Sequence, residues 1–384
     1  MRLEQLRLYN FRCYSDVEIF PDPRFNVVYG LNGQGKTSLL EAVGLLTFLR
    51  SFRGAKNAEM LRAEQTEGLV TGLVRHGTLD FRLAVKLWPT RKQATFNGKS
   101  CKYLSEYVGK IAAVSFSPSD LEIIRGAPEN RRAWIDKLAQ IFDPSHADAV
   151  ARYQKILEHR NRQLKAVSDG RVAALSADFE TWTDELCSWG SKIIHNRIHS
   201  VENSVDRIQK YYAQIAGENI NINVGYKSEI LPQVPYGQRP SDSLELVGQA
   251  LRNGLQNSLK KELILGTTLV GPHRDDLSIL MGGHPMRSFG SQGEVRSLVL
   301  AMRLTEVEAC QEALRVNPIL LIDDFSSELD ANRRKFLLDY LSSSDSQVFL
   351  STTEELRLGK EFFVTSGKVI PHDNQRVIDG RQQL

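Results

Sequence analysis

The stretch that most constrains the fold is the glycine-rich loop "GLNGQGKT" at residues 30–37, which fits the phosphate-binding pattern G-x-x-x-x-G-K-[ST]. An apolar segment at 25–29 precedes it and is typical of a buried strand. A helical pattern follows it, with Leu39, Leu40, Val43 and Leu46 on its apolar side. Strand, loop and helix in this order predict a P-loop nucleotide site in an α/β fold; the flanks argue against a chance glycine-rich turn.

The residues of this loop have different predicted roles in binding ATP. Its glycines let backbone N–H groups surround the phosphates of ATP, Lys36 reaches the β- and γ-phosphates, and the Thr37 hydroxyl binds Mg²⁺. The candidate ATP-binding residues of this segment are Gly30, Leu31, Asn32, Gly33, Gln34, Gly35, Lys36, Thr37 and Ser38.

A second segment, "NPILLIDDFSSELD", supplies candidate acidic groups. Residues 319–322 form a continuous apolar run, as a strand buried on both faces of a parallel sheet requires. Asp323 at its end is the expected Mg²⁺ ligand, and Asp324 is the expected catalytic residue that orients or deprotonates the attacking water. The alternative is an ordinary acidic turn at a strand end.

The two segments are far apart in sequence, which predicts a split head domain. We expect residues 1–128 and 267–384 to form the head and 129–266 to form an inserted helical arm. Apolar residues at helical spacing run from Leu175 to Ile215, with a stutter expected near Gly190. Two further helices are expected around Tyr153 to Leu164 and Leu244 to Leu259.

Composition excludes several classes of protein. The chain has 41% hydrophobic and 25% charged residues, and no apolar run approaches the roughly 18 residues that span a bilayer. We therefore expect a cytoplasmic protein with no membrane partner. The four cysteines are scattered, which favours neither disulfides nor zinc. The net charge of +3 is too small to indicate nucleic-acid binding by itself.

A second candidate anion site lies in "SFGSQGEVRSLVLAMRL" at 288–304. Small residues, among them Ser291 and Gly293, lead into a helix whose free N–H groups and dipole favour a phosphate. The segment has no lysine or metal-binding carboxylate of its own to complete a nucleotide site. It therefore requires a nucleotide that is held elsewhere.

Taken together, the segments "LYNFRCYSDVEI", "GLNGQGKTSLLEAV", "SFRGAK", "FSPSDLEIIRGAPENRRAWID", "LVGPHRDDL", "FGSQGEVRSLVLAMRL" and "ILLIDDFSSELD" resemble the RecF family of bacterial recombination-repair ATPases. The resemblance spans the whole chain. It implies an ABC-type ATPase head, similar to SMC heads, with a helical arm. It further implies a homodimer that closes around two ATP molecules, ATP-dependent DNA binding, slow and DNA-stimulated hydrolysis, and cooperation with RecR and RecO in loading RecA onto gapped DNA.

The resemblance also implies roles for residues. Lys36 and Thr37 are the P-loop residues and Asp323 the metal ligand. Asp324 stands where many such ATPases have a catalytic glutamate. Ser291 is the signature serine, which acts in trans on the partner's ATP. Residues 327–330 resemble a dimer-contact loop, and 117–121 lie where a metal-sensing loop is expected, although no glutamine occurs there. Arg12 either approaches the nucleotide or is a plain surface residue.

A departure from the family pattern lies beside the signature. Glu294-Val295 replaces a polar pair, and the carboxylate suits a helix start but brings negative charge close to ATP.

Two basic clusters are candidate DNA surfaces. Residues 86–103 combine basic and aromatic side chains around an Asn97-Gly98 hairpin signal, with Arg91, Lys92, Lys99 and Lys102 as candidates. Arg131 and Arg132 in the arm are the second cluster. Solvated strand edges and helix faces are the alternatives. Neither cluster reads bases, so duplex and junction DNA would bind with weak sequence preference and strong salt dependence.

Rival functions fit less well. A transporter ATPase predicts a histidine near Thr352, a nuclease-coupled SMC-type head predicts long heptad arms with a zinc hook, and a small-molecule kinase predicts closer motifs. His195 and His199 are spaced like metal ligands on a helix, but they have no third partner in the sequence.

Overall fold

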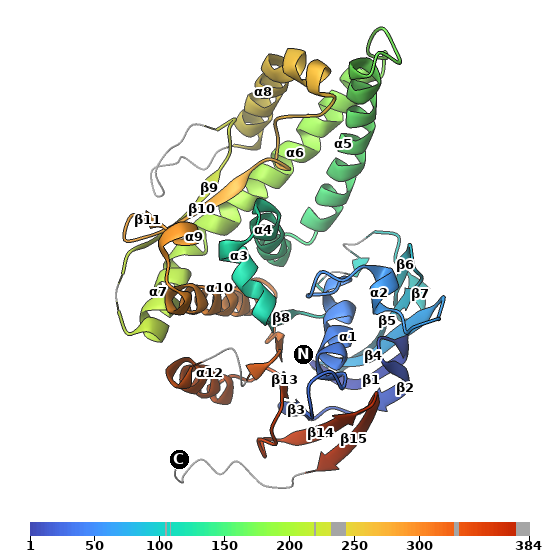
Figure 1. Ribbon diagram of the computed structural model, residues 1–384, viewed down its shortest axis with the longest axis vertical. Helices are drawn as coiled ribbons and strands as arrows, with labels where there is room; N and C mark the ends of the chain where they lie inside the picture. Colours follow the sequence, from blue (N-terminus) through green and yellow to red (C-terminus); the bar gives the residue numbers. More distant parts are fainter. Residues whose placement is uncertain (104–105, 108, 219, 232–242, 326–329, 374–384) are drawn as a thin grey trace. The chain divides into compact units, whose positions relative to one another are not determined.

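The structure, a computed structural model, describes residues 1–103, 106–107, 109–218, 220–231, 243–325 and 330–373 (Figure 1). The chain divides into two compact units. The first contains Met1–Asp120 and Glu306–Leu384, and the second contains Leu121–Thr305. The expected helical arm at 129–266 lies within the second unit, which also contains the signature segment.

A mostly parallel sheet organises the first unit. Its strand order is β15-β14-β3-β13-β12-β8, and all neighbours except β15 and β14 are parallel. The strands are β3 (Phe25–Tyr29), β8 (Ala113–Phe116), β12 (Ile319–Ile322), β13 (Val348–Thr352), β14 (Lys360–Thr365) and β15 (Lys368–Asp373). The run at 319–322 is fully buried, which confirms the interpretation of its unbroken apolar character.

An antiparallel sheet forms the other layer of this unit, with the order β2-β1-β4-β5-β6-β7. Its strands are β1 (Arg2–Phe11), β2 (Tyr14–Ile19), β4 (Gly68–His76), β5 (Leu79–Leu87), β6 (Lys92–Phe96) and β7 (Lys99–Ser100). Helix α1 (Lys36–Phe48) contacts strands of both sheets, and its leucines are buried in their shared core. Since both sheets cover this helix, its apolar residues surround it instead of lining one face. The unit also contains α2 (Asn57–Met60), η2 (Pro118–Leu121) and α12 (Ala331–Ser343).

The second unit combines helices with a small antiparallel sheet of order β11-β10-β9. The helices are α3 (Glu122–Arg125), α4 (Pro128–Phe142), α5 (His146–Ser168), α6 (Phe179–Glu202), α7 (Val205–Ala216), α8 (Leu244–Leu265), α9 (Met286–Phe289) and the start of α10 (Gln292–Ala313). The strands are β9 (Ile222–Lys227), β10 (Asp276–Met281) and β11 (His284–Pro285). Because β9 pairs with β10, the chain beyond residue 266 stays in the same unit as the helices.

The single long helix expected over residues 175–215 is wrong, because the structure has two helices there. Helix α6 continues through Gly190, and the helical run breaks at residues 203–204, before α7. A Cβ at Gly190 would lie 2.7 Å from Leu251 Cδ2 and 3.1 Å from Tyr153 Cε2. The glycine therefore allows α6 to approach α8 and α5 closely.

Buried polar groups tie the second unit together. Arg160 of α5 and Glu262 of α8 are almost completely buried and form an ion pair of 2.7 Å. The "GPHRDDL" segment is a buried polar turn, in which Asp275 accepts a hydrogen bond of 2.6 Å from the Tyr226 hydroxyl. Burial raises the pKa of Asp275 from its ordinary 3.8 to about 6. The folded chain therefore holds this proton more tightly than the unfolded chain.

Candidate nucleotide site

The phosphate loop lies at the C-terminal end of β3 and opens into a cavity of about 760 Å³. The backbone there demands glycine. Gly35 has φ 118°, and a Cβ on it would lie 2.6 Å from Cys13 Sγ. Gly30 has φ 145°, and a Cβ on it would lie 2.3 Å from the Val364 carbonyl oxygen of β14. These two glycines are therefore required by the close approach of neighbouring strands as well as by their backbone angles.

Lys36 begins α1 and lies over the loop. Its Nζ donates to the carbonyl oxygens of Gly30, at 2.7 Å, and Leu31, at 3.0 Å. Burial lowers the pKa of the ammonium, whereas Asp324 and Asp323 act in the opposite direction. The first turn of α1 contains no acidic residue, so its free N–H groups and dipole favour an anion. The loop, helix start and lysine therefore fit the triphosphate of ATP.

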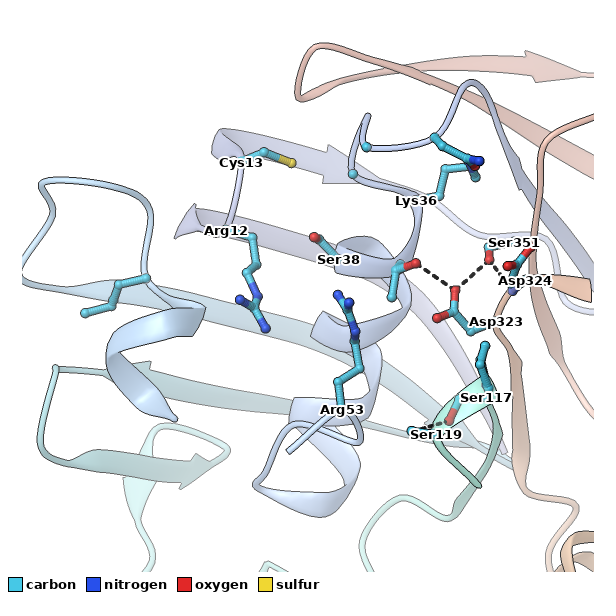
Figure 2. A pocket seen from close by; sticks show the side chains of 16 residues that line it. Arg12, Cys13, Lys36, Ser38, Arg53, Ser117, Ser119, Asp323, Asp324 and Ser351 are labelled. Carbon is cyan, nitrogen blue, oxygen red and sulfur yellow. Dashed lines mark hydrogen bonds between the residues drawn. The ribbon is translucent and has the colours of Figure 1, made fainter. Parts of the chain in front are cut away.

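The two predicted metal ligands, Thr37 of α1 and Asp323 after β12, contact each other, and Figure 2 shows Asp323 with its neighbour Ser351. The Thr37 hydroxyl donates to Asp323 Oδ1 at 2.8 Å, and the Ser351 hydroxyl donates to the same oxygen at 2.7 Å. Burial raises the pKa of Asp323, while these two hydrogen bonds lower it. A hydroxyl and a carboxylate beside a phosphate loop are hard oxygen donors, and they fit Mg²⁺.

Asp324 also lines the cavity. Its φ of 54° is in the left-handed region, which is uncommon for a residue with a side chain. Its backbone N–H donates to Ser351 Oγ at 2.9 Å. The turn after β12 thus presents both carboxylates to one cavity, which favours a built site over an ordinary acidic turn.

Arg12 lines the cavity, and Glu41 and Glu59 hold its guanidinium group in place. Its guanidinium makes two hydrogen bonds to the buried Glu41 carboxylate of α1, at 2.7 and 2.8 Å, and a third to the Glu59 carbonyl oxygen. Ser51 also donates to Glu41. The structure therefore places Arg12 at the cavity, where hydrogen bonds fix its side chain. This excludes the alternative that Arg12 is an ordinary surface residue.

Sequence reasoning missed four other lining residues: Arg53, Cys13, Leu61 and Ser351. Arg53 is exposed, and its charge lowers the pKa of Asp323. Arg53 belongs to the segment "SFRGAK", one of the segments that carry the family resemblance, but no function was predicted for this segment. The sequence around Ser351 contains no motif that predicts a role for it, because its contact with Asp323 depends on the pairing of β13 with β12.

The other P-loop predictions divide into two groups. Asn32, Gly33, Gly35, Lys36, Thr37 and Ser38 line the cavity. Leu31 is 76% exposed, and Gln34 accepts a hydrogen bond from the Ser366 backbone at 2.7 Å; neither lines the cavity. Residues 117–119 of the expected metal-sensing segment do line it, with Ser117 and Ser119 hydroxyls 2.8 Å apart. Residues 327–329 of the expected dimer-contact loop lie outside the described residues.

The signature segment belongs to the second unit. Ser291 and Glu294 form a capping box at the start of α10. Ser291 Oγ accepts from the Glu294 N–H at 3.2 Å, and Glu294 accepts from the Ser291 N–H at 2.6 Å. Hydrogen bonding from the Ser291 backbone N–H and then from the Ser291 side chain lowers the pKa of the Glu294 carboxyl. The unusual carboxylate is therefore a helix cap.

The candidate DNA residues of the first unit form an exposed hairpin. Strands β6 and β7 pair across Asn97 and Gly98, whose φ values of 48° and 79° match the predicted turn. Arg91 lies over the Trp88 ring with its Cζ 4.4 Å from the ring centroid. The exposed basic residues are Arg91, Lys92, Lys99 and Lys102.

The structure contradicts the exposed role expected for the two arm arginines. Arg131 is 4% exposed and makes hydrogen bonds of 2.6 and 2.9 Å to Asp276. Arg132 donates to the Asp275 carbonyl oxygen and to Glu129. Both tie α4 to the chain at Asp275 and Asp276; the Arg131 guanidinium is occupied inside the protein, whereas Arg132 is partly buried and also pairs with the exposed Glu129.

Comparisons with known proteins show the family to which the chain is similar. The RecF/RecN/SMC N terminal domain family matches residues 2–362. The chain is 33% identical over 377 residues to "DNA replication and repair protein RecF" of Geotalea uraniireducens, covering 96% of this chain and 100% of that protein. The protein of the same description from Rippkaea orientalis is also 33% identical, over 97% of this chain and 100% of that protein.

Solved structures give the same result. The recombination mediator protein RecF with ATPrS, in the RecFOR pathway, superposes with a TM-score of 0.86 at 31% identity, covering 96% of this chain and 98% of that one. The corresponding RecF structure with ATP has a TM-score of 0.85. An Smc head bound to part of ScpA has a TM-score of 0.54 at 15% identity, which shows the shared fold alone. No helix among the described residues is long and apolar enough to cross a membrane.

Proposed function

The chain belongs to the RecF family of DNA replication and repair proteins, and on this premise we propose that it is an ATP-dependent DNA-binding protein of recombinational repair. The observation that carries the proposal is the cavity in which Thr37 and Asp323, from distant parts of the sequence, meet at 2.8 Å beside a complete phosphate loop. The RecF structures with ATP and ATPrS support the same ligand.

Five side chains of the cavity have roles in ATP hydrolysis to ADP and phosphate. Lys36 and the N–H groups of α1 bind and neutralise the phosphates. Thr37 and Asp323 would hold Mg²⁺, which when bound neutralises charge that develops on the phosphate oxygens. Asp324 orients the attacking water and accepts its proton. Arg53 adds a positive charge on the open side of the cavity.

Hydrolysis acts as a switch. A single chain carries one phosphate loop and one signature segment, so two copies of this chain complete two sites. Ser291 and Gly293 of one copy reach the ATP that the other copy holds, and ATP binding thereby stabilises a homodimer. Hydrolysis removes this link, and the two copies of the dimer are released from each other.

The basic hairpin supplies a DNA contact. Arg91, Lys92, Lys99 and Lys102 are exposed along one short strand pair, which suits a phosphate backbone. We infer binding to gapped and junction DNA with weak sequence preference, slow DNA-stimulated hydrolysis, and cooperation with RecR and RecO in loading RecA in the cytoplasm.

Three measurements test the proposal. In the first, sedimentation with a slowly hydrolysed ATP analogue should convert a monomer into a dimer, and Ser291→Ala should bind the analogue but stay monomeric. Because Ser291 also caps α10, Ser291→Asp is the matched control that keeps a capping acceptor. A dimer formed equally well by Ser291→Ala contradicts the role in trans.

The second measurement addresses hydrolysis. Asp324→Ala should bind ATP and lose roughly 100-fold or more of its turnover, the range typical of removing a general base. Wild-type turnover in this variant contradicts the assigned role. DNA binding to gapped, duplex and single-stranded substrates, with and without ATP, then tests the ligand class.

A further inference from the structure

Ser351 has a position that its sequence context does not reveal. It lies near the C-terminal end of β13, next to β12, and the register pairs Ile322 with Leu350. The parallel register therefore brings Ser351 beside Asp323, the first residue after β12. Ser351 is 1% exposed, but it lines the nucleotide cavity.

The Ser351 hydroxyl joins both acidic residues through one oxygen atom. It donates to Asp323 Oδ1 at 2.7 Å and accepts from the Asp324 backbone N–H at 2.9 Å (Figure 2). An ionised carboxylate only accepts and a backbone N–H only donates, so the direction of both hydrogen bonds is fixed. The hydroxyl therefore donates its one hydrogen to Asp323 and accepts one hydrogen bond, from Asp324.

Each bond restrains a different degree of freedom. The bond to Asp323 holds the carboxylate in the rotamer in which Oδ1 also faces the Thr37 hydroxyl. The bond from Asp324 stabilises a backbone at φ 54°, a conformation that costs of order 1 to 3 kcal/mol in a residue other than glycine. Loss of this one hydroxyl therefore loosens the metal ligand and the water-orienting acid together.

We propose that Ser351 is a positioning residue that sets the geometry of the metal ligand Asp323 and of the catalytic acid Asp324. The proposal rests on the proposed ATPase function of the same cavity. Ser351 itself holds neither the phosphates nor the metal; it acts through its two neighbours.

The matched control is Ser346, a second buried serine that lies just before β13. It is also 1% exposed, and its Oγ has no hydrogen-bond partner among the described residues. Ser351→Ala and Ser346→Ala therefore make the same chemical change near the two ends of one strand. Only the first removes the link to the acidic pair.

The test uses the full chain and three variants: Ser351→Ala, Ser351→Thr, which retains the hydroxyl, and Ser346→Ala. Turnover, the KM for ATP and the Mg²⁺ concentration for half-maximal turnover are measured. Mn²⁺ affinity in the presence of a non-hydrolysable ATP analogue is measured by electron paramagnetic resonance, which requires no activity.

We expect Ser351→Ala to lose roughly 10- to 100-fold in kcat and in Mn²⁺ affinity, the usual cost of removing a group that orients a metal ligand. Its affinity for the ATP analogue without metal should stay close to wild type, since the phosphate loop is unchanged. Ser351→Thr should recover most of the loss, and Ser346→Ala should match wild type.

Wild-type Mn²⁺ affinity and kcat in Ser351→Ala would overturn the proposal, as would equal losses in Ser346→Ala. A folded Ser351→Thr that recovers nothing also contradicts it. An inactive wild-type protein refutes the proposed ATPase function instead, and in that case the Mn²⁺ measurement still decides the role of Ser351.

Discussion

The buried ion pair between Arg12 and Glu41 offers the sharpest test of how the cavity is supported. The Glu41 side chain is 0% exposed, Arg12 is 21% exposed, and two parallel N–H···O bonds of 2.7 and 2.8 Å join them. The perturbation is a double-mutant cycle of Arg12→Ala, Glu41→Ala and both together. It separates the pair's coupling from the loss of each side chain.

The expected loss of stability follows from the burial of Glu41. Arg12→Ala leaves the Glu41 carboxylate deep in the core, where it still accepts a hydrogen bond from the Ser51 hydroxyl. Removing one partner of a buried pair costs about 3 to 5 kcal/mol, and the partial exposure of Arg12 favours the lower end, about 3 kcal/mol. The double variant should cost less than the sum of the single variants by about 2 kcal/mol, because it leaves no unpaired charge.

Hydrogen exchange is the suitable assay, since a chain with two compact units need not unfold in one step. Opening free energies of peptides from β1 and α1 are compared among the four proteins, and peptides from α8 serve as the internal control. Arg12→Lys tests geometry, because lysine keeps the charge but lacks the two-pronged donor. Additivity within about 0.5 kcal/mol would refute the claim that this pair supports the cavity.

Further predictions concern binding, pH and charge. Lys36→Ala should lose detectable ATP binding in calorimetry while keeping its far-ultraviolet circular dichroism; retained affinity would contradict its role. Asp275, whose folded pKa is raised to about 6 from 3.8, stabilises the fold in its protonated form, and this contribution is lost as pH rises through 6. Asp275→Asn should therefore gain stability relative to wild type by about 2 to 3 kcal/mol between pH 4 and pH 7 in urea unfolding, and a pH-independent difference would contradict the raised pKa. Lys99→Gln with Lys102→Gln should reduce the salt dependence of DNA affinity by about 2 in log–log slope at most, whereas an unchanged slope would exclude the hairpin as a contact.

Local patterns predicted much of the fold because they report local physics. The glycines at 30, 33 and 35 reveal the phosphate loop, since all three have positive φ angles that favour glycine, and a Cβ at Gly30 or Gly35 would also collide with its neighbours. The unbroken apolar run before Asp323 reveals a buried parallel strand. The Asn97-Gly98 pair reveals the hairpin. The helical periodicities locate α5, α6 and α8, although the run expected as one helix is divided into α6 and α7 at residues 203–204.

The sequence by itself determined which residues can bind phosphate and metal, because that capacity belongs to side-chain chemistry and to the loop's backbone. Tertiary structure decided which side chains are available and which support them. It buried Arg131 against Asp276, tethered Arg12 to Glu41 and placed the Ser351 hydroxyl between the Asp323 carboxylate and the Asp324 backbone N–H, which follow a neighbouring strand. These outcomes depend on strand register and helix packing between segments far apart in the chain. Such contacts leave no mark in the local pattern of a single sequence, so an arginine that ends in an internal ion pair looks the same there as one that faces solvent.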